Sequence, residues 1–153
     1  MKIIFLDIDG VFNYVRCKYK LGHVYFVDPE KIKLLKQLID KTGAKVILSS
    51  TWRYGWMDLN NGCDSSNSRD FVKLRDEFEK YGVEFMDYTP KYSAYRGDEI
   101  DLWLKNWKGE KIETFVIFDD DNDMNPYMRN LVRSSFTKGL EQKHINKAMK
   151  ILN

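Results

Sequence analysis

The chain has 153 residues, of which 43% are hydrophobic and 31% charged, and its formal net charge is +2. This length predicts one domain with a single core over residues 1–153, and the composition excludes an intrinsically disordered chain. The small net charge excludes nucleic-acid binding through overall charge, so such contacts must come from local patches. Two isolated cysteines and the lack of a signal-like apolar N-terminus favour a cytoplasmic protein without membrane partners.

The first third of the chain alternates strand and helix signals. An apolar run that ends in acids predicts a buried strand, and an acid followed by proline is a strong helix start. The predicted elements are a strand at 2–6, a flap or small hairpin at about 12–27, a helix from Asp28-Pro29 to Gly43, and a strand at 45–48.

The rest of the chain repeats this alternation. The predicted elements are a loop at 52–67, a helix from Ser68 to Gly82, a strand at 83–86, a loop at 87–96, a helix around residues 100–107, a strand at 114–118, a short strand near 131–134, and a helix with apolar residues from 145 to 152. Alternating strands and helices are typical of a parallel sheet. The sequence therefore predicts an α/β fold, a Rossmann-like parallel sheet with helices on both faces.

Polar residues follow three of the predicted strands. They are Asp7 and Asp9, Ser49 and Ser50, and Asp119 and Asp120. Because right-handed crossovers bring the carboxyl ends of parallel strands to one edge, we expect these groups to converge. Acids from two strands can hold one Mg²⁺ ion, which prefers oxygen ligands. Hydroxyl and backbone N–H groups can then bind phosphate, and Arg96 or Lys91 can offset its charge.

A carboxylate in such a site can attack phosphorus and form an aspartyl-phosphate, which water then cleaves. A second acid can protonate the leaving oxygen and later activate the water. For Asp7 and Asp9 taken alone, the alternative interpretation is a strand that ends in a solvated acidic turn.

Four segments, in this order, resemble the motifs of the haloacid dehalogenase (HAD) superfamily of phosphohydrolases. They are DIDGV at Asp7–Val11, KVILSS at Lys45–Ser50, the basic Arg96 or Lys91, and VIFDDDND at Val116–Asp123. The segments ILSSTWR, RGDEIDLWL and FDDDNDM are similar to the HAD domain of Swiss Army Knife RNA repair proteins. The fourth motif holds four acids, so the resemblance implies a metal ligand there and leaves Asp119, Asp120 and Asp123 open.

The resemblance also implies roles for the other motif residues. Asp7 is expected to be the nucleophile and a metal ligand. Asp9 is expected to be the general acid/base, with its backbone carbonyl on the Mg²⁺ ion. Ser49, with Ser50 beside it, is expected to bind the phosphoryl group, and Arg96 to stabilise it. The third motif of the superfamily is usually lysine, but arginine can contact phosphate through two N–H groups.

The resemblance implies that insertions forming a cap over the site determine which substrate binds. Because this chain has only a short flap in place of a cap, we expect an open site. An open site suits a phosphorylated macromolecule such as a nucleic-acid end, and the aromatic flap also suits a nucleotide. We expect Arg53 to hold a neighbouring phosphate and Trp52, Trp56 or Tyr14 to stack on a base. The alternative is a catalytically weak HAD-fold domain that binds phosphorylated partners. The sequence leaves the oligomeric state open.

Overall fold

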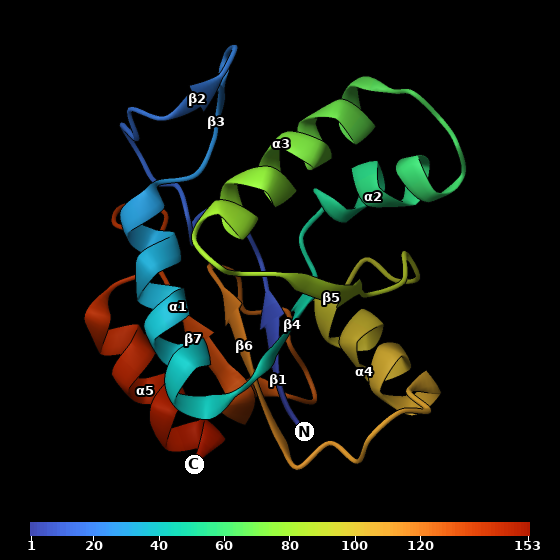
Figure 1. The fold of residues 1–153 in the computed structure, drawn as a ribbon. Coiled ribbons are helices and arrows are strands. Elements are labelled where there is room, and N and C mark those ends of the chain that lie inside the picture. Colours follow the sequence, from blue (N-terminus) through green and yellow to red (C-terminus); the bar gives the residue numbers. More distant parts are fainter.

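The computed structural model describes residues 1–153, and its centre is a five-stranded sheet (Figure 1). The strand order is β5-β4-β1-β6-β7, so β1 lies in the middle. The strands are β1 (Lys2–Leu6), β4 (Lys45–Leu48), β5 (Phe85–Tyr88), β6 (Thr114–Asp119) and β7 (Leu131–Arg133). Each neighbouring pair is parallel, which confirms the predicted α/β sheet.

Helices cover both faces of this sheet. They are α1 (Pro29–Thr42), α2 (Arg53–Asn60), α3 (Ser66–Lys80), α4 (Arg96–Asn106) and α5 (Gln142–Leu152), with a 3₁₀ turn at Met128–Asn130. Buried residues of α1, α3 and α5 pack on one face, and those of α4 pack on the other. None of the helices has the length and apolar character needed to span a bilayer. A separate hairpin, β2 (Lys20–Leu21) and β3 (Val24–Tyr25), stands above the sheet edge (Figure 1).

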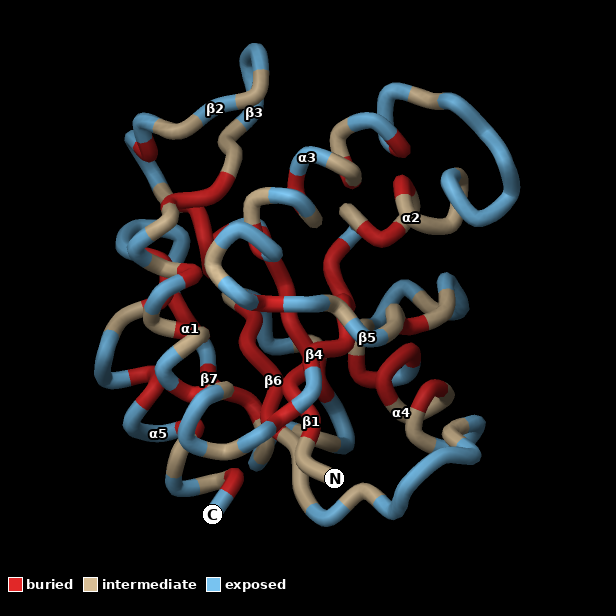
Figure 2. Tube along the Cα trace, in the orientation of Figure 1, coloured by how far each residue is buried: buried red, intermediate tan, exposed pale blue.

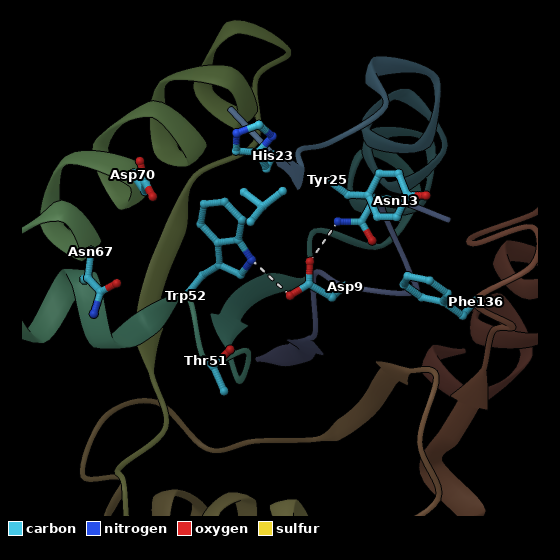
Figure 3. Close-up of a pocket in the computed structure, with 11 residues that line it drawn as sticks. Asp9, Asn13, His23, Tyr25, Thr51, Trp52, Asn67, Asp70 and Phe136 are labelled. Atoms are coloured by element: carbon cyan, nitrogen blue, oxygen red, sulfur yellow. Dashed lines mark hydrogen bonds between the residues drawn. The ribbon is translucent and has the colours of Figure 1, made fainter. Parts of the chain in front are cut away.

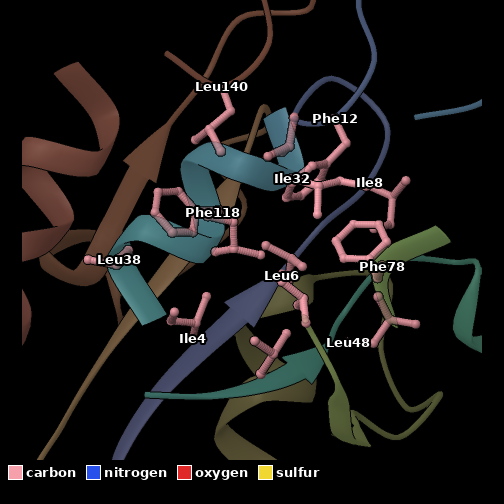
Figure 4. Packing of buried hydrophobic residues seen from close by; sticks show 14 of the residues in the cluster. Ile4, Leu6, Ile8, Phe12, Ile32, Leu38, Leu48, Phe78, Phe118 and Leu140 are labelled. Carbon is pink, nitrogen blue, oxygen red and sulfur yellow. The ribbon is translucent and has the colours of Figure 1, made fainter. Parts of the chain in front are cut away.

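The central strand β1 is buried on both sides (Figure 2). Ile4 and Leu6 belong to the larger apolar cluster, whereas Ile3 and Phe5 belong to the smaller one under α4. Figure 4 shows Ile4 and Leu6 among side chains from α1, α3 and β6. Burying each such aliphatic side chain stabilises the fold by about 1.5–3 kcal/mol. A strand held from both faces is a rigid support for the acids that follow it.

Several predicted boundaries were wrong. The predicted loop at 52–67 contains α2, which begins after Trp52 with no side-chain cap, so no capping residue marked its start. Ser65, rather than Ser68, caps α3 in a reciprocal capping box. The third strand starts two residues later than expected because the Val83 N–H still closes the end of α3, donating to the Phe78 carbonyl at 3.0 Å.

Candidate active site

Three strand ends meet at the carboxyl edge of the sheet. The backbone ladder continues past the strands: the Asp7 N–H donates to the Phe118 carbonyl at 2.9 Å, and the Ser49 N–H donates to the Leu6 carbonyl at 2.9 Å. Asp119 is the last residue of β6. Because β1 lies between β4 and β6, Asp7 is placed between Ser49 and Asp119.

Asp7, Asp119 and Asp120 form an acidic cluster in which one carboxylate oxygen from each residue lies within 4.8 Å of the others. Burial raises the pKa of Asp119 to about 8; the Asp7 charge adds to this effect and Arg96 opposes it. Burial likewise raises the pKa of Asp7, again against the attraction of Arg96. The positive charge of Arg96 therefore does not fully balance the three carboxylates, and a bound divalent cation would lower their mutual repulsion.

Arg96, the first residue of α4, enters this cluster directly. Its Nη1 atom lies 2.8 Å from Asp7 Oδ1 and 2.8 Å from Asp119 Oδ2. Burial disfavours the charged guanidinium, but the two carboxylates outweigh burial and raise the pKa of Arg96. A permanently charged group thus bridges the ends of β1 and β6.

Gly10 allows the turn after β1 to lie against the cluster. Its φ is +80°, and a Cβ at this position would lie only 2.2 Å from Asp120 Oδ2. The Ser134 hydroxyl donates to the Gly10 carbonyl at 2.6 Å and so ties the turn to the residue after β7. Any side chain at Gly10 would displace the Asp120 carboxylate.

The acids after β6 have separate surroundings. Asp120 joins Asp7 and Asp119, whereas Asp121 is exposed. Asp123 caps α4: its Oδ2 accepts from the Arg96 N–H at 3.0 Å, and its carbonyl accepts from the Gly97 N–H at 2.9 Å. Of the three acids that the sequence left open as metal ligands, Asp119 and Asp120 are those placed beside Asp7.

The Ser49 hydroxyl is buried and has no hydrogen-bond partner. A buried hydroxyl without a partner costs free energy, so its persistence points to a ligand that completes it. The Thr89 hydroxyl, at the end of the neighbouring strand β5, is also buried and unpartnered, although no motif in the sequence points to it. Ser50 differs, because its Oγ accepts from the Trp52 N–H at 3.2 Å and supports the turn into α2.

The family described as the HAD domain in Swiss Army Knife RNA repair proteins matches residues 3–145. The chain belongs to this family. The assignment confirms the resemblance seen in the sequence and places the chain among HAD-type phosphohydrolases. No curated protein gives a significant match to the chain.

HAD proteins generally use Mg²⁺, and the donors in this HAD domain fit that ion. Mg²⁺ prefers carboxylate oxygens and retains several waters. Asp7 and Asp119 are buried carboxylates from two strands, and Asp120 adds a third that is partly open to solvent.

The Asp9 carboxylate lies outside the acidic cluster and faces a pocket instead (Figure 3). Its Oδ1 accepts from Asn13 Nδ2 at 2.8 Å, and its Oδ2 accepts from Trp52 Nε1 at 3.2 Å. The Asn13 amide also accepts from the Gly10 N–H at 3.0 Å, so it links the turn to the carboxylate. The expected contact of the Asp9 carbonyl with Mg²⁺ stays a prediction.

The substrate-binding role expected for Arg53 is wrong in this structure, because the side chain is 1% exposed. Its guanidinium donates to the carbonyls of Ser49 (2.8 Å), Ser50 (3.0 Å) and Thr89 (2.9 Å). It also forms an ion pair with Glu99 at 2.8 Å. Arg53 therefore positions the turn after β4, and its donors are not available to a phosphate in the pocket.

The remaining candidates separate in the same way. Lys91 is exposed, with its Nζ 4.8 Å from the centroid of the Tyr54 ring, so Arg96 is the basic residue that the fold brings to Asp7. Trp52 lines the pocket beside Asp9. Trp56 instead stacks on the core residue Phe71, and the Tyr14 hydroxyl donates to Asp28 at 2.6 Å. Trp52 is thus the one expected stacking residue that faces the pocket.

Proposed function

We propose that the protein is a Mg²⁺-dependent phosphomonoesterase in which Asp7 is the nucleophile. The supporting observation is the placement of Asp7 between the unpartnered Ser49 hydroxyl and the Arg96 guanidinium. A phosphoryl group brought to Asp7 meets a hydroxyl donor on one side and a fixed positive charge on the other. Both groups stabilise charge that develops on the phosphoryl oxygens.

The reaction has two steps. An Asp7 oxygen attacks phosphorus, the bond from phosphorus to the leaving oxygen breaks, and Asp9 donates a proton to that oxygen. Water then attacks the aspartyl-phosphate, gives its proton to Asp9 and releases inorganic phosphate, which restores Asp7. Asn13 and Trp52 hold the Asp9 carboxylate in one orientation for both proton transfers.

Asp7, Asp119 and Asp120 are the residues that would hold Mg²⁺. When bound, Mg²⁺ lowers the repulsion between a carboxylate nucleophile and an anionic phosphate. The chain itself offsets part of this repulsion through Arg96, whose positive charge lies between Asp7 and Asp119.

The substrate class that fits best is a nucleotide or a nucleic-acid end that carries a phosphate. The pocket beside Asp9 has aromatic walls from Trp52, Tyr25 and Phe136, and aromatic faces suit the stacking of a base. The chain's family comprises HAD domains of RNA repair proteins, which agrees with this class.

The test is hydrolysis of an aryl phosphate by the metal-free protein, with and without added Mg²⁺, followed by a comparison of kcat/KM values. The compared substrates are a 3′-phosphorylated oligonucleotide, a nucleoside monophosphate and a hexose phosphate. Asp7→Asn is the control that separates enzyme activity from contamination. A preference for the hexose phosphate would reject the substrate class. Phosphate binding without Mg²⁺-dependent turnover would favour a phospho-binding domain instead.

A further inference from the structure

A pocket of about 470 Å³ lies between the β2–β3 hairpin and the helices α2 and α3 (Figure 3). Asp9 and Trp52 line it on the side of the acidic cluster, and Asn67 and Asp70 line it from α3. Its volume falls in the range of about 300–1,000 Å³ that is usual for small-molecule sites. The pocket is therefore large enough for more than the phosphoryl group.

The position of Asp9, the proposed proton donor, determines which part of a substrate occupies this pocket. A general acid must lie within hydrogen-bond distance of the leaving oxygen that it protonates. The Asp9 carboxylate is exposed to the pocket, whereas Asp7 and Arg96 lie in the acidic cluster. The leaving group therefore extends from Asp9 into the pocket while the phosphoryl group stays at Asp7.

The walls of the pocket select the chemistry of that leaving group. No lysine or arginine lines the pocket, and two carboxylates, Asp9 and Asp70, do. This arrangement disfavours a second phosphate or a carboxylate inside the pocket. The rings of Trp52, Tyr25 and Phe136 offer apolar surface. The part of the leaving group that enters the pocket should be neutral and have an aromatic face and hydrogen-bond donors, and a nucleoside has these properties.

Asn67 and Asp70 are three residues apart on α3, so they face the same side of the helix. Asp70 has no hydrogen-bond or ion-pair partner in the protein, although it is only partly exposed. Gly55 lets α2 approach here, because a Cβ at Gly55 would lie 2.0 Å from the Asn67 carbonyl oxygen. Both residues line the pocket, so an acceptor-only carboxylate and a carboxamide lie on one of its walls.

Building on the proposed phosphatase function, we propose that this pocket binds the leaving nucleoside and prefers guanosine. Guanine presents two adjacent donors, N1–H and the 2-amino group, which match the two oxygens of the Asp70 carboxylate. The Asn67 amide can donate to the O6 and N7 acceptors on the neighbouring edge of the base. Uracil offers one N–H between two carbonyl oxygens, and those oxygens are repelled by a carboxylate.

The experiment compares kcat/KM for GMP, UMP and ribose 5-phosphate in the wild type and in Asp70→Asn. We expect GMP to exceed UMP by about tenfold or more, and ribose 5-phosphate to be the poorest substrate. In Asp70→Asn the ratio of GMP to UMP falls toward one. Glu79→Gln removes an acid on the same helix outside the pocket and keeps the wild-type ratio. Oligonucleotides that end in 3′-phosphorylated guanosine or uridine show whether the substrate is a nucleic-acid end or a free nucleotide.

A second measurement separates the pocket from the catalytic proposal. Calorimetric titration of the metal-free protein with guanosine and with uridine reports binding without turnover, and tighter binding of guanosine that Asp70→Asn abolishes supports the assignment. If this preference is found in a protein that hydrolyses no phosphate, the pocket assignment stands and the phosphatase proposal fails. Equal affinities for the two nucleosides, or a guanosine preference that survives in Asp70→Asn, would overturn the pocket assignment.

Discussion

The Arg53 guanidinium and the Glu99 carboxylate form an ion pair of 2.8 Å in which the two side chains are 1% and 7% exposed. Glu99 lies on α4 one turn after Arg96, and Arg53 also holds the carbonyls after β4. The pair therefore connects the turn that carries Ser49 to the helix that carries Arg96. Two groups expected to contact the phosphoryl group are held in register by a contact outside the site.

Removing one partner of this pair should cost stability. Glu99→Gln leaves the Arg53 charge buried without its counter-ion, which we expect to lower the free energy of unfolding by about 3–5 kcal/mol. Urea denaturation followed by circular dichroism measures this. The matched control is Asp64→Asn, which removes the partner of Arg69 in an exposed pair and should cost less than about 1 kcal/mol. Similar losses in the two variants would show that the buried pair does not support the site.

Arg96→Ala should lower kcat/KM strongly, whereas Lys91→Ala should change it little. Arg96 bridges Asp7 and Asp119, but Lys91 is exposed and lies over the Tyr54 ring. Loss of a charge that faces the developing phosphoryl charge costs about 10²–10³-fold in kcat by analogy with other electrostatic stabilisers. Steady-state kinetics on an aryl phosphate decide the matter. A larger loss in Lys91→Ala would transfer the basic motif to that residue.

Variants of the acids after β6 should differ in how much Mg²⁺ they need for activity. Asp119→Asn and Asp120→Asn each remove a donor from the cluster, so we expect both to raise the Mg²⁺ concentration needed for half-maximal activity. Asp123→Ala should act on the stability of α4, because Asp123 caps the first turn of that helix and alanine has no acceptor for the Arg96 N–H. Mg²⁺ titrations of activity, with thermal unfolding in parallel, test the contrast. An unchanged Mg²⁺ requirement in both cluster variants would remove them from the metal site.

Asp9→Asn should slow turnover by about 10²–10⁴-fold, because the carboxamide can neither donate nor accept the transferred proton. The fold should be kept, since the Asp9 side chain is exposed and the amide oxygen can still accept from one of its two donors, Asn13 or Trp52. Rapid-quench analysis tests whether phosphoenzyme accumulates when its hydrolysis slows more than its formation. Normal turnover in Asp9→Asn would contradict the acid/base role.

The sheet and the acidic cluster could be predicted because their signals are local. An apolar run that ends in Asp7, and another that ends in Asp119, mark strand ends directly. The pattern could not show that Arg53 is buried, because an arginine that follows a polar turn has the same sequence signal in the interior and on the surface. Its partner Glu99 lies 46 positions away, and only the packing of α4 against the turn after β4 brings them together.

The start of α2 and its close contact with α3 could not be predicted either, because both depend on tertiary structure. Trp52 provides no cap, and Gly55 is unfavourable inside a helix by about 1 kcal/mol relative to alanine, so intrinsic propensity argued against α2. The close approach of α3 at Gly55 explains why the glycine is there. His144 is buried, because its ring belongs to the capping box at the start of α5.

This capping box makes the stability of the protein depend on pH. His144 Nδ1 accepts from the Glu141 N–H at 2.9 Å at the start of α5, and only the neutral ring has a lone pair there. Burial is the main cause that lowers the pKa of His144 below its usual 6.5. Because the folded pKa lies below the unfolded one, the unfolded chain takes up the proton at higher pH. The contribution of His144 is therefore complete above pH 6.5 and is lost as the pH falls through the folded pKa.

His144→Gln keeps an oxygen that can accept from the Glu141 N–H but does not titrate. We expect the free energy of unfolding of the wild type to fall more steeply than that of His144→Gln as the pH is lowered from about 7.5 to about 5. Urea denaturation across this range measures the difference, and it cancels the contributions of the carboxylates common to both proteins. His23→Gln, which removes an exposed histidine on the hairpin, should follow the wild-type curve. Parallel curves for the wild type and His144→Gln would show that the ring stays neutral, or stays paired, over the whole range.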